Sequence, residues 1–126
     1  MHYKTYKNYE SLNEIDAGKF EGFTYTQFKN QFSLEYKNRK ANKLTYRYPD
    51  GESYEDLAQR VTPILNEIKK GDNLIVCHRA VLRILYGKLM NLPMKDVPLI
   101  DIPLHTIFKF EIIDGNITME KITIDV

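Results

Sequence analysis

The chain has 126 residues, the usual size of one domain. Apolar residues make up 43% of it and charged residues 28%, which excludes collagen-like, low-complexity and disordered chains. The 18 lysines and arginines against 17 aspartates and glutamates give a formal charge of +1. This balance argues against a globally basic nucleic-acid binder and against an acidic tail.

The single cysteine, Cys77, cannot form an internal disulfide framework or a thiolate metal site. No apolar run approaches the roughly 18–20 residues needed to cross a bilayer. Residues 1–7 lack the apolar core of a signal peptide. We therefore expect a soluble, cytoplasmic protein without a membrane partner.

The first part of the chain predicts a short strand followed by helices. Residues 9–15 resemble a strand that runs into a polar loop at 16–18. Scattered phenylalanines predict one or two short helices between about 24 and 40. Residues 46–51 are rich in turn formers and predict a loop.

A longer helix is expected next. Ser53 is suited to cap its first turn, which carries Asp56. Apolar residues then recur at helical spacing as far as Ile68, and Gly71 supplies the stop. Pro63 lies inside this helix and should kink it or shift its true start.

The second half predicts a buried strand, a helix and a hairpin. The unbroken apolar run 74–77 is typical of a strand buried on both faces, and an amphipathic helix is expected over 81–91. Residues 106–113 alternate with period two, a turn follows at 114–116, and 117–125 form the returning strand. The order β-α-α-β-α-β-β predicts an α/β domain.

His78 carries the strongest functional signal. It follows the predicted buried strand and precedes a helix, a place where α/β proteins bind anions. Arg79 and Arg83 are four residues apart on that helix, and a cation in the first turn opposes the helix dipole unless an anion is bound there. The alternative is a solvated arginine pair beside a histidine that satisfies local hydrogen bonds.

A second cluster of cations lies in residues 36–49, which hold five cations and no acid. The cations are Lys37, Arg39, Lys40, Lys43 and Arg47, with Tyr36, Tyr46 and Tyr48 interleaved. Such a patch is suited to clamp phosphates. Composition alone favours a solvated face, and a weak nucleic-acid surface is a further alternative.

Two carboxylates, Glu14 and Asp16, lie near the end of the first predicted strand. They suit proton transfer, because burial or a charged neighbour raises the pKa of a carboxyl group, although surface carboxylates are the commoner explanation. His2 and His105 show no metal-ligand spacing, and no glycine-rich nucleotide loop occurs. Together these residues indicate a metal-free site for a multiply phosphorylated small molecule.

Four segments now carry a recognisable pattern. They are Asn-Glu-Ile-Asp-Ala-Gly at 13–18, Tyr-Arg-Tyr-Pro-Asp-Gly-Glu-Ser-Tyr-Glu-Asp-Leu at 46–57, Val-Cys-His-Arg-Ala-Val-Leu-Arg at 76–83 and Pro-Leu-His-Thr at 103–106. In this order they resemble the fructose-2,6-bisphosphatase domain of the bifunctional 6-phosphofructo-2-kinase/fructose-2,6-bisphosphatase family, a branch of the histidine phosphatase, or phosphoglycerate mutase-like, superfamily. The resemblance spans about residue 9 to about residue 112.

The resemblance implies a fold and an activity. The fold is part of a phosphoglycerate mutase-like three-layer sandwich, with a mostly parallel sheet and a C-terminal antiparallel hairpin. The activity is hydrolysis of fructose 2,6-bisphosphate to fructose 6-phosphate and phosphate, a reaction of glycolytic regulation that uses no metal or cofactor.

It also implies roles for residues. In the family, a histidine of an Arg-His-Gly motif takes up the 2-phosphate, and a glutamate, matched here by Glu14, protonates the leaving sugar oxygen. A second histidine, matched by His78, stabilises the transferring phosphoryl group. The substrate-binding positions of the family fall on Tyr25, Arg39, Lys43, Tyr54, Arg79 and Arg83.

Two departures qualify the resemblance. Arg79 stands where close family members carry glutamine, and the 126 residues contain no Arg-His-Gly. We therefore expect residues 1–126 to be a single domain that corresponds to the C-terminal two-thirds of the family domain and is inactive alone. The family's nucleophile strand would be missing, and the resulting unpaired edge favours a homodimer or other association.

Other functions stay open. A second polypeptide could supply the missing strand of a split phosphatase, or the chain could be a non-catalytic sugar-phosphate sensor. Arg79 also permits a related phosphatase with another substrate. Nucleic-acid binding through residues 36–49 is disfavoured, because acids follow directly at 50–56.

Overall fold

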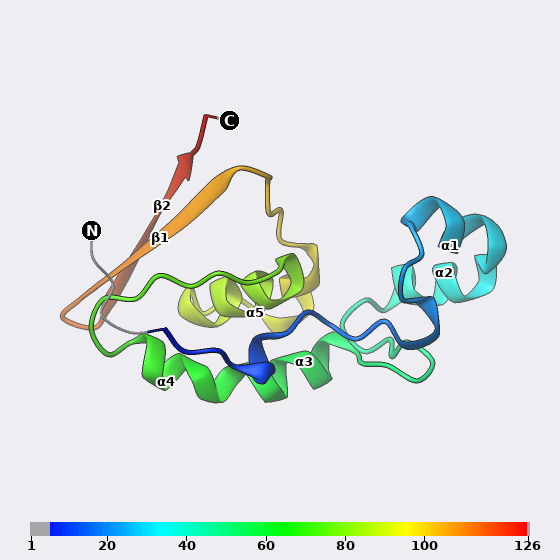
Figure 1. Cartoon of the computed structure of the whole chain (residues 1–126), viewed down its shortest axis with the longest axis horizontal. Helices are drawn as coiled ribbons and strands as arrows, with labels where there is room; N and C mark the ends of the chain where they lie inside the picture. Colours follow the sequence, from blue (N-terminus) through cyan, green and yellow to red (C-terminus); the bar gives the residue numbers. More distant parts are fainter. Residues whose placement is uncertain (1–5, 126) are drawn as a thin grey trace.

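The structure is a computed structural model that describes residues 6–125. The expectations for His2 and for most of the chain start lie outside this range. Two helical lobes and a hairpin follow one another along the molecule (Figure 1). In chain order the elements are η1 (Glu10–Leu12), η2 (Gly18–Phe20), α1 (Tyr25–Gln31), α2 (Ser33–Ala41), α3 (Tyr54–Val61), η3 (Thr62–Ile64), α4 (Leu65–Ile68), α5 (Arg79–Leu89), η4 (Met94–Leu99), β1 (Thr106–Ile113) and β2 (Asn116–Thr123).

Helices α1 and α2 form a small lobe at one end of the molecule (Figure 1). Thr24 caps α1 in a reciprocal pair of hydrogen bonds with Gln27. The buried ring of Phe20 contacts Phe28 and Phe32 edge-on, with ring centroids 4.5 and 4.8 Å apart. The prediction of one or two short helices between about 24 and 40 is confirmed, and two are present.

The longer predicted helix is present but broken. The Ser53 hydroxyl accepts the Asp56 amide at 3.1 Å, and the Asp56 carboxylate accepts the Ser53 amide at 2.8 Å. Pro63 lies in η3, which separates α3 from α4, because proline cannot donate the hydrogen bond that a continuous helix needs. Gly71 follows with a φ of +75°, as expected of a stop.

The main core lies between α3 and α5. Leu57 and Val61 of α3 and Val81 and Ile84 of α5 are fully buried, so each of these helices contributes one apolar face. Val97 of η4 closes the core from a third side.

Both strands expected in the first 77 residues are wrong. Residues 9–15 form η1 and irregular backbone, and residues 74–77 have no regular secondary structure. A strand needs a hydrogen-bonded neighbour, and within residues 6–125 the sheet consists of β1 and β2 alone. Leu74 and Val76 are consequently 60% and 88% exposed. The expected burial of this run on both faces is therefore wrong as well.

The C-terminal hairpin is present as expected. Strands β1 and β2 pair antiparallel from Thr106 opposite Thr123 to Ile113 opposite Asn116. Asp114 and Gly115 both have positive φ, +51° and +79°, as a two-residue type I′ turn requires.

The hairpin is attached to α5 by aromatic contacts. The ring of Tyr86 lies edge-on against Phe108 and Phe110 of β1, with centroids 5.8 and 5.9 Å apart. In the part of the chain that the structure describes, no helix is long and apolar enough to cross a membrane.

Candidate active site

An open groove of about 500 Å³ lies at the start of α5. Of the residues given a role by the family resemblance, all but Lys43 line it, although they come from separate segments of the chain. Its lining residues are Glu14, Ile15, Tyr25, Arg39, Tyr48, Tyr54, Cys77, His78, Arg79, Ala80, Leu82, Arg83, Ile102, Pro103, Leu104, His105 and Thr106.

The N-terminus of α5 opens into this groove. His78 is the N-cap residue, with extended backbone at φ −100°, and its side chain makes no capping hydrogen bond. His78 and Arg79 are both exposed. The amides of a first helical turn and a cation beside them are features of an anion site.

Glu14 lies in the loop after η1, not at the end of a strand. One carboxylate oxygen accepts the Ile15 amide at 2.9 Å. The other accepts the Ala80 amide in the first turn of α5, at 3.4 Å. Asp16, its expected partner, lies outside the groove and accepts the Gly18 amide at 2.8 Å.

Arg83 and Tyr54 line the groove side by side. Arg83 donates to the Ile100 carbonyl at 2.8 Å and to the Tyr54 hydroxyl at 2.9 Å. Tyr54 is only 4% exposed, and burial raises the pKa of its hydroxyl, so the group stays protonated.

Arg39 reaches the groove from α2. It donates to the Tyr25 hydroxyl at 3.2 Å, and its guanidinium lies 5.2 Å from the centroid of the Tyr25 ring and 5.7 Å from that of Tyr48. The two aromatic faces hold the cation in place without neutralising it.

Lys43 does not line the groove but contacts Tyr54, which does. Its ammonium donates to the Pro98 carbonyl at 2.9 Å and lies 5.8 Å from the centroid of the Tyr54 ring. Burial, and then the charges of Arg83, Arg39 and Arg79, lower the pKa of Lys43 to about 8. Lys43 therefore belongs to the same positive cluster as these three arginines.

None of these four cations forms an ion pair with an acid within residues 6–125. Cations brought together without ion-pair partners repel one another. Such an arrangement is typical of a site whose negative charge arrives with a ligand.

The predicted cationic patch at 36–49 divides into two parts. Arg39 and Lys43 belong to the site, whereas Lys37 and Lys40 are exposed and do not line the groove. Arg47 is paired with Asp56 at 2.8 Å. The sequence spacing of these cations does not tell which of them face the groove. The orientation of α2 and the path of the loop after it decide this.

The sequence pattern assigned no site role to Tyr48 and His105, two further residues with polar side chains that line the groove. Tyr48 had a signal, since aromatic residues alternate with cations in the patch. His105 has a φ of +54°, an unusual backbone conformation for a residue other than glycine, and sequence does not reveal it.

The groove holds one thiol. Cys77 is half-buried, and burial raises its pKa to about 11, so it stays protonated and is a poor nucleophile. Within the described residues, no group of three or more His, Cys, Asp or Glu side chains could hold a metal ion.

Curated relatives of this chain are fructose-2,6-bisphosphatases by name. A probable fructose-2,6-bisphosphatase of Schizosaccharomyces pombe is 40% identical over 119 residues. The 6-phosphofructo-2-kinase/fructose-2,6-bisphosphatase 4 of Rattus norvegicus is 38% identical over 122 residues. These matches cover 94% and 96% of this chain but only 29% and 26% of the relatives' own lengths.

Solved structures share the fold. The α-ribazole phosphatase of Shigella flexneri superimposes with a TM-score of 0.75 at 22% identity, over 94% of this chain and 62% of that one. A mycobacterial glucosyl-3-phosphoglycerate phosphatase solved with inorganic phosphate gives a TM-score of 0.64 at 21% identity, over 90% of this chain and 61% of that one. The expected partial phosphoglycerate mutase-like fold is thereby confirmed. The mostly parallel sheet expected with it is wrong for residues 6–125, because their two strands pair antiparallel.

The sequence profile of the histidine phosphatase superfamily (branch 1) matches residues 2–125. This match covers nearly the whole chain and agrees with the fold and with the relatives. The chain therefore belongs to the histidine phosphatase superfamily.

Proposed function

We propose that the groove binds the fructose 6-phosphate portion of fructose 2,6-bisphosphate. The observation that carries this proposal is the convergence of Lys43, Arg39, Arg79 and Arg83, none of them paired with an acid in the described chain, at the start of α5. A phosphate would neutralise this cluster. The relatives are named for fructose 2,6-bisphosphate, which is why we choose this compound as the proposed ligand.

Each predicted residue has a role in this proposal. Arg39, Lys43 and Arg83 bind phosphate charge, and the Tyr25 and Tyr54 hydroxyls bind oxygens of the sugar phosphate. His78 and Arg79 stabilise the phosphoryl group in transfer. The Glu14 carboxyl group donates a proton to the leaving sugar oxygen, which lowers the barrier to its departure.

We further propose that the 126 residues alone bind this ligand without turning it over. They contain no Arg-His-Gly, and His105, the other histidine of the groove, is flanked by Leu104 and Thr106. Without a nucleophilic histidine no phosphohistidine forms. A second polypeptide that supplied such a histidine would complete the reaction, which is the split-phosphatase form of the same proposal.

Two measurements on the purified chain test both statements. Calorimetry with fructose 6-phosphate should give saturable binding, and binding should be lost in an Arg83→Ala variant. Incubation with fructose 2,6-bisphosphate radiolabelled at the 2-phosphate should leave no acid-labile label on the chain. No heat at millimolar ligand would refute the binding site, and stoichiometric label would refute the absence of turnover.

A further inference from the structure

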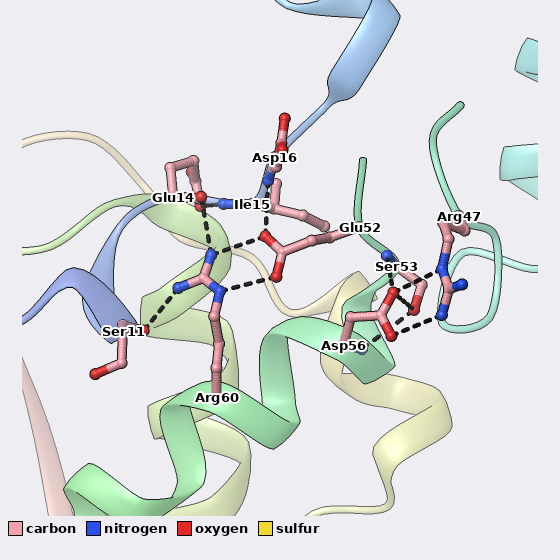
Figure 2. Close-up of polar contacts among 9 residues, drawn as sticks. All are labelled: Ser11, Glu14, Ile15, Asp16, Arg47, Glu52, Ser53, Asp56 and Arg60. Atoms are coloured by element: carbon pink, nitrogen blue, oxygen red, sulfur yellow. Dashed lines mark hydrogen bonds and ion pairs between the residues drawn. The ribbon is translucent and has the colours of Figure 1, made fainter. Parts of the chain in front are cut away.

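A single arginine on α3 holds the main chain that carries Glu14. Arg60 donates from Nη1 to the Ser11 carbonyl at 2.7 Å and from Nη2 to the Glu14 carbonyl at 3.0 Å (Figure 2). Its guanidinium therefore fixes two points of the loop at once. Hydrogen bonds from a charged donor are stronger than those between neutral groups.

Glu52 orients that arginine. Its carboxylate forms a bidentate pair with Arg60, at 2.8 Å from Nε and 2.9 Å from Nη2. The same carboxylate accepts the Asp16 amide at 3.0 Å, and the Glu52 amide donates to the Asp16 carbonyl at 2.8 Å. Both side chains are partly buried, 25% and 21% exposed, so salt and solvent screen the pair less than they would a fully exposed one.

The two residues together hold the loop from Ser11 to Asp16 on both sides of Glu14 (Figure 2). This loop is not a strand, so no sheet ladder fixes it. The direction of the Glu14 side chain follows from the position of its own backbone. With the backbone held, the carboxylate reaches the Ile15 amide and the Ala80 amide at the start of α5.

We propose that Arg60, oriented by Glu52, is the positioning residue for Glu14. It fixes the distance between the Glu14 carboxylate and the first turn of α5. Neither residue lines the groove with the phosphate-binding cations, so Arg60 acts through Glu14. The proposal rests on the proposed function for the role of Glu14 as proton donor, but the geometry that it describes exists without ligand.

The chain offers a matched control, an arginine of the loop before α3 that pairs with a residue on α3. Arg47 forms a similar bidentate pair with Asp56, at 2.9 Å from Nε and 2.8 Å from Nη2 (Figure 2). Arg47 is more exposed, at 66%, and donates to no carbonyl of the Glu14 loop. Loss of this pair removes an arginine–carboxylate contact and leaves the loop in place.

Amide hydrogen exchange of the 126-residue chain, followed by NMR, tests the proposal. In Arg60→Lys the ammonium cannot reach Glu52 and both carbonyls together, so the Ile15 and Ala80 amides should exchange at least about tenfold faster. The Leu85 amide, deep in α5, should keep its rate. Arg47→Lys should leave all three rates within about twofold of wild type.

A double-substitution cycle separates positioning from general support. In Glu14→Ala the Ala80 amide loses its acceptor, so its exchange accelerates. If Arg60 acts through Glu14, adding Arg60→Lys to that variant should change the Ala80 rate by less than about twofold. Effects that multiply in the double variant, or Ile15 and Ala80 rates unchanged in Arg60→Lys, would overturn the proposal.

Two further measurements keep the test decisive. Should Arg60→Lys not fold, Glu52→Gln keeps the size of the side chain and should accelerate the same two amides in a smaller degree, and unchanged rates would count against the proposal. Fructose 6-phosphate binding by the wild-type chain is measured separately. Its absence would refute the proposed function while the exchange rates still decide the role of Arg60.

Discussion

Lys43 is a cation whose charge depends on its arginine neighbours. Its pKa of about 8 follows from burial and from Arg83, Arg39 and Arg79. Below that pH the ammonium is charged and attracts phosphate, and above it the amine is neutral. A bound anion favours the charged form, so binding takes up a proton.

We therefore expect the affinity for fructose 6-phosphate to fall as pH rises through about 8. The sugar phosphate itself is already close to a dianion above about pH 7, because its second pKa is near 6. Calorimetry from about pH 7 to about pH 9.5 measures this. Lys43→Arg should bind with little dependence on pH over this range, and an equal fall in that variant would assign the titration to another group.

At the scale of elements, α5 and η4 are in close contact at Gly87. A Cβ atom at this position would lie 2.4 Å from the nearest side-chain carbon of Val97. Gly87 has no positive φ, so its reason for being glycine is space and not backbone conformation.

Gly87→Ala should destabilise the fold by about 1–3 kcal/mol, because overpacking forces η4 away from α5. Urea denaturation followed by circular dichroism measures the loss. Combining it with Val97→Ala removes the clashing methyl groups, so the double variant should lose less than the sum of the two single losses. Additive losses would show that the two residues do not press against each other.

The helices were predictable because their signals are local. Ser53 with Asp56, Pro63 and Gly71 lie within the segment that they cap, break or end, and each acts as expected. The strand predicted at 74–77 is wrong because its signal was not sufficient by itself. The apolar run shows that these side chains favour burial. A strand also needs a neighbouring strand to hydrogen-bond with, and the residues of the run carry no information about that neighbour.

In the candidate site, too, the local signals were predictable and the long-range contacts were not. The pattern of residues selected Glu14, His78 and the groove cations, and the structure brings all but Lys43 to one groove. Arg60 had no signal, because its role arises from carbonyls 49 and 46 residues away in the chain. A sequence pattern shows which side chains are charged or titratable, but it does not show which main-chain carbonyls a side chain will contact.

On the scale of the whole molecule, apolar side chains are exposed on an unpaired segment. Leu74 is 60% and Val76 88% exposed, and both edges of the β1–β2 hairpin are unpaired within residues 6–125. Backbone groups without partners and apolar side chains beside them favour pairing with another chain.

We expect the 126-residue chain to self-associate, with a mass that rises with concentration in sedimentation equilibrium. Val76→Lys should shift this equilibrium toward the monomer, because a charge there opposes burial. Leu99→Lys is a matched control at a similarly exposed position, 70% exposed, on η4. A monomer at all concentrations, or equal effects of the two variants, would contradict association through this segment.

The unpaired cations at the start of α5 also have a kinetic consequence. The chain as a whole carries a formal charge of only +1, so its positive potential is concentrated where Arg39, Lys43, Arg79 and Arg83 meet. A local field of this kind draws an anion inward before any contact is made, over a reach of about 8 Å at physiological salt. Capture of a bisphosphorylated sugar should therefore slow markedly as salt is added, while its release changes little.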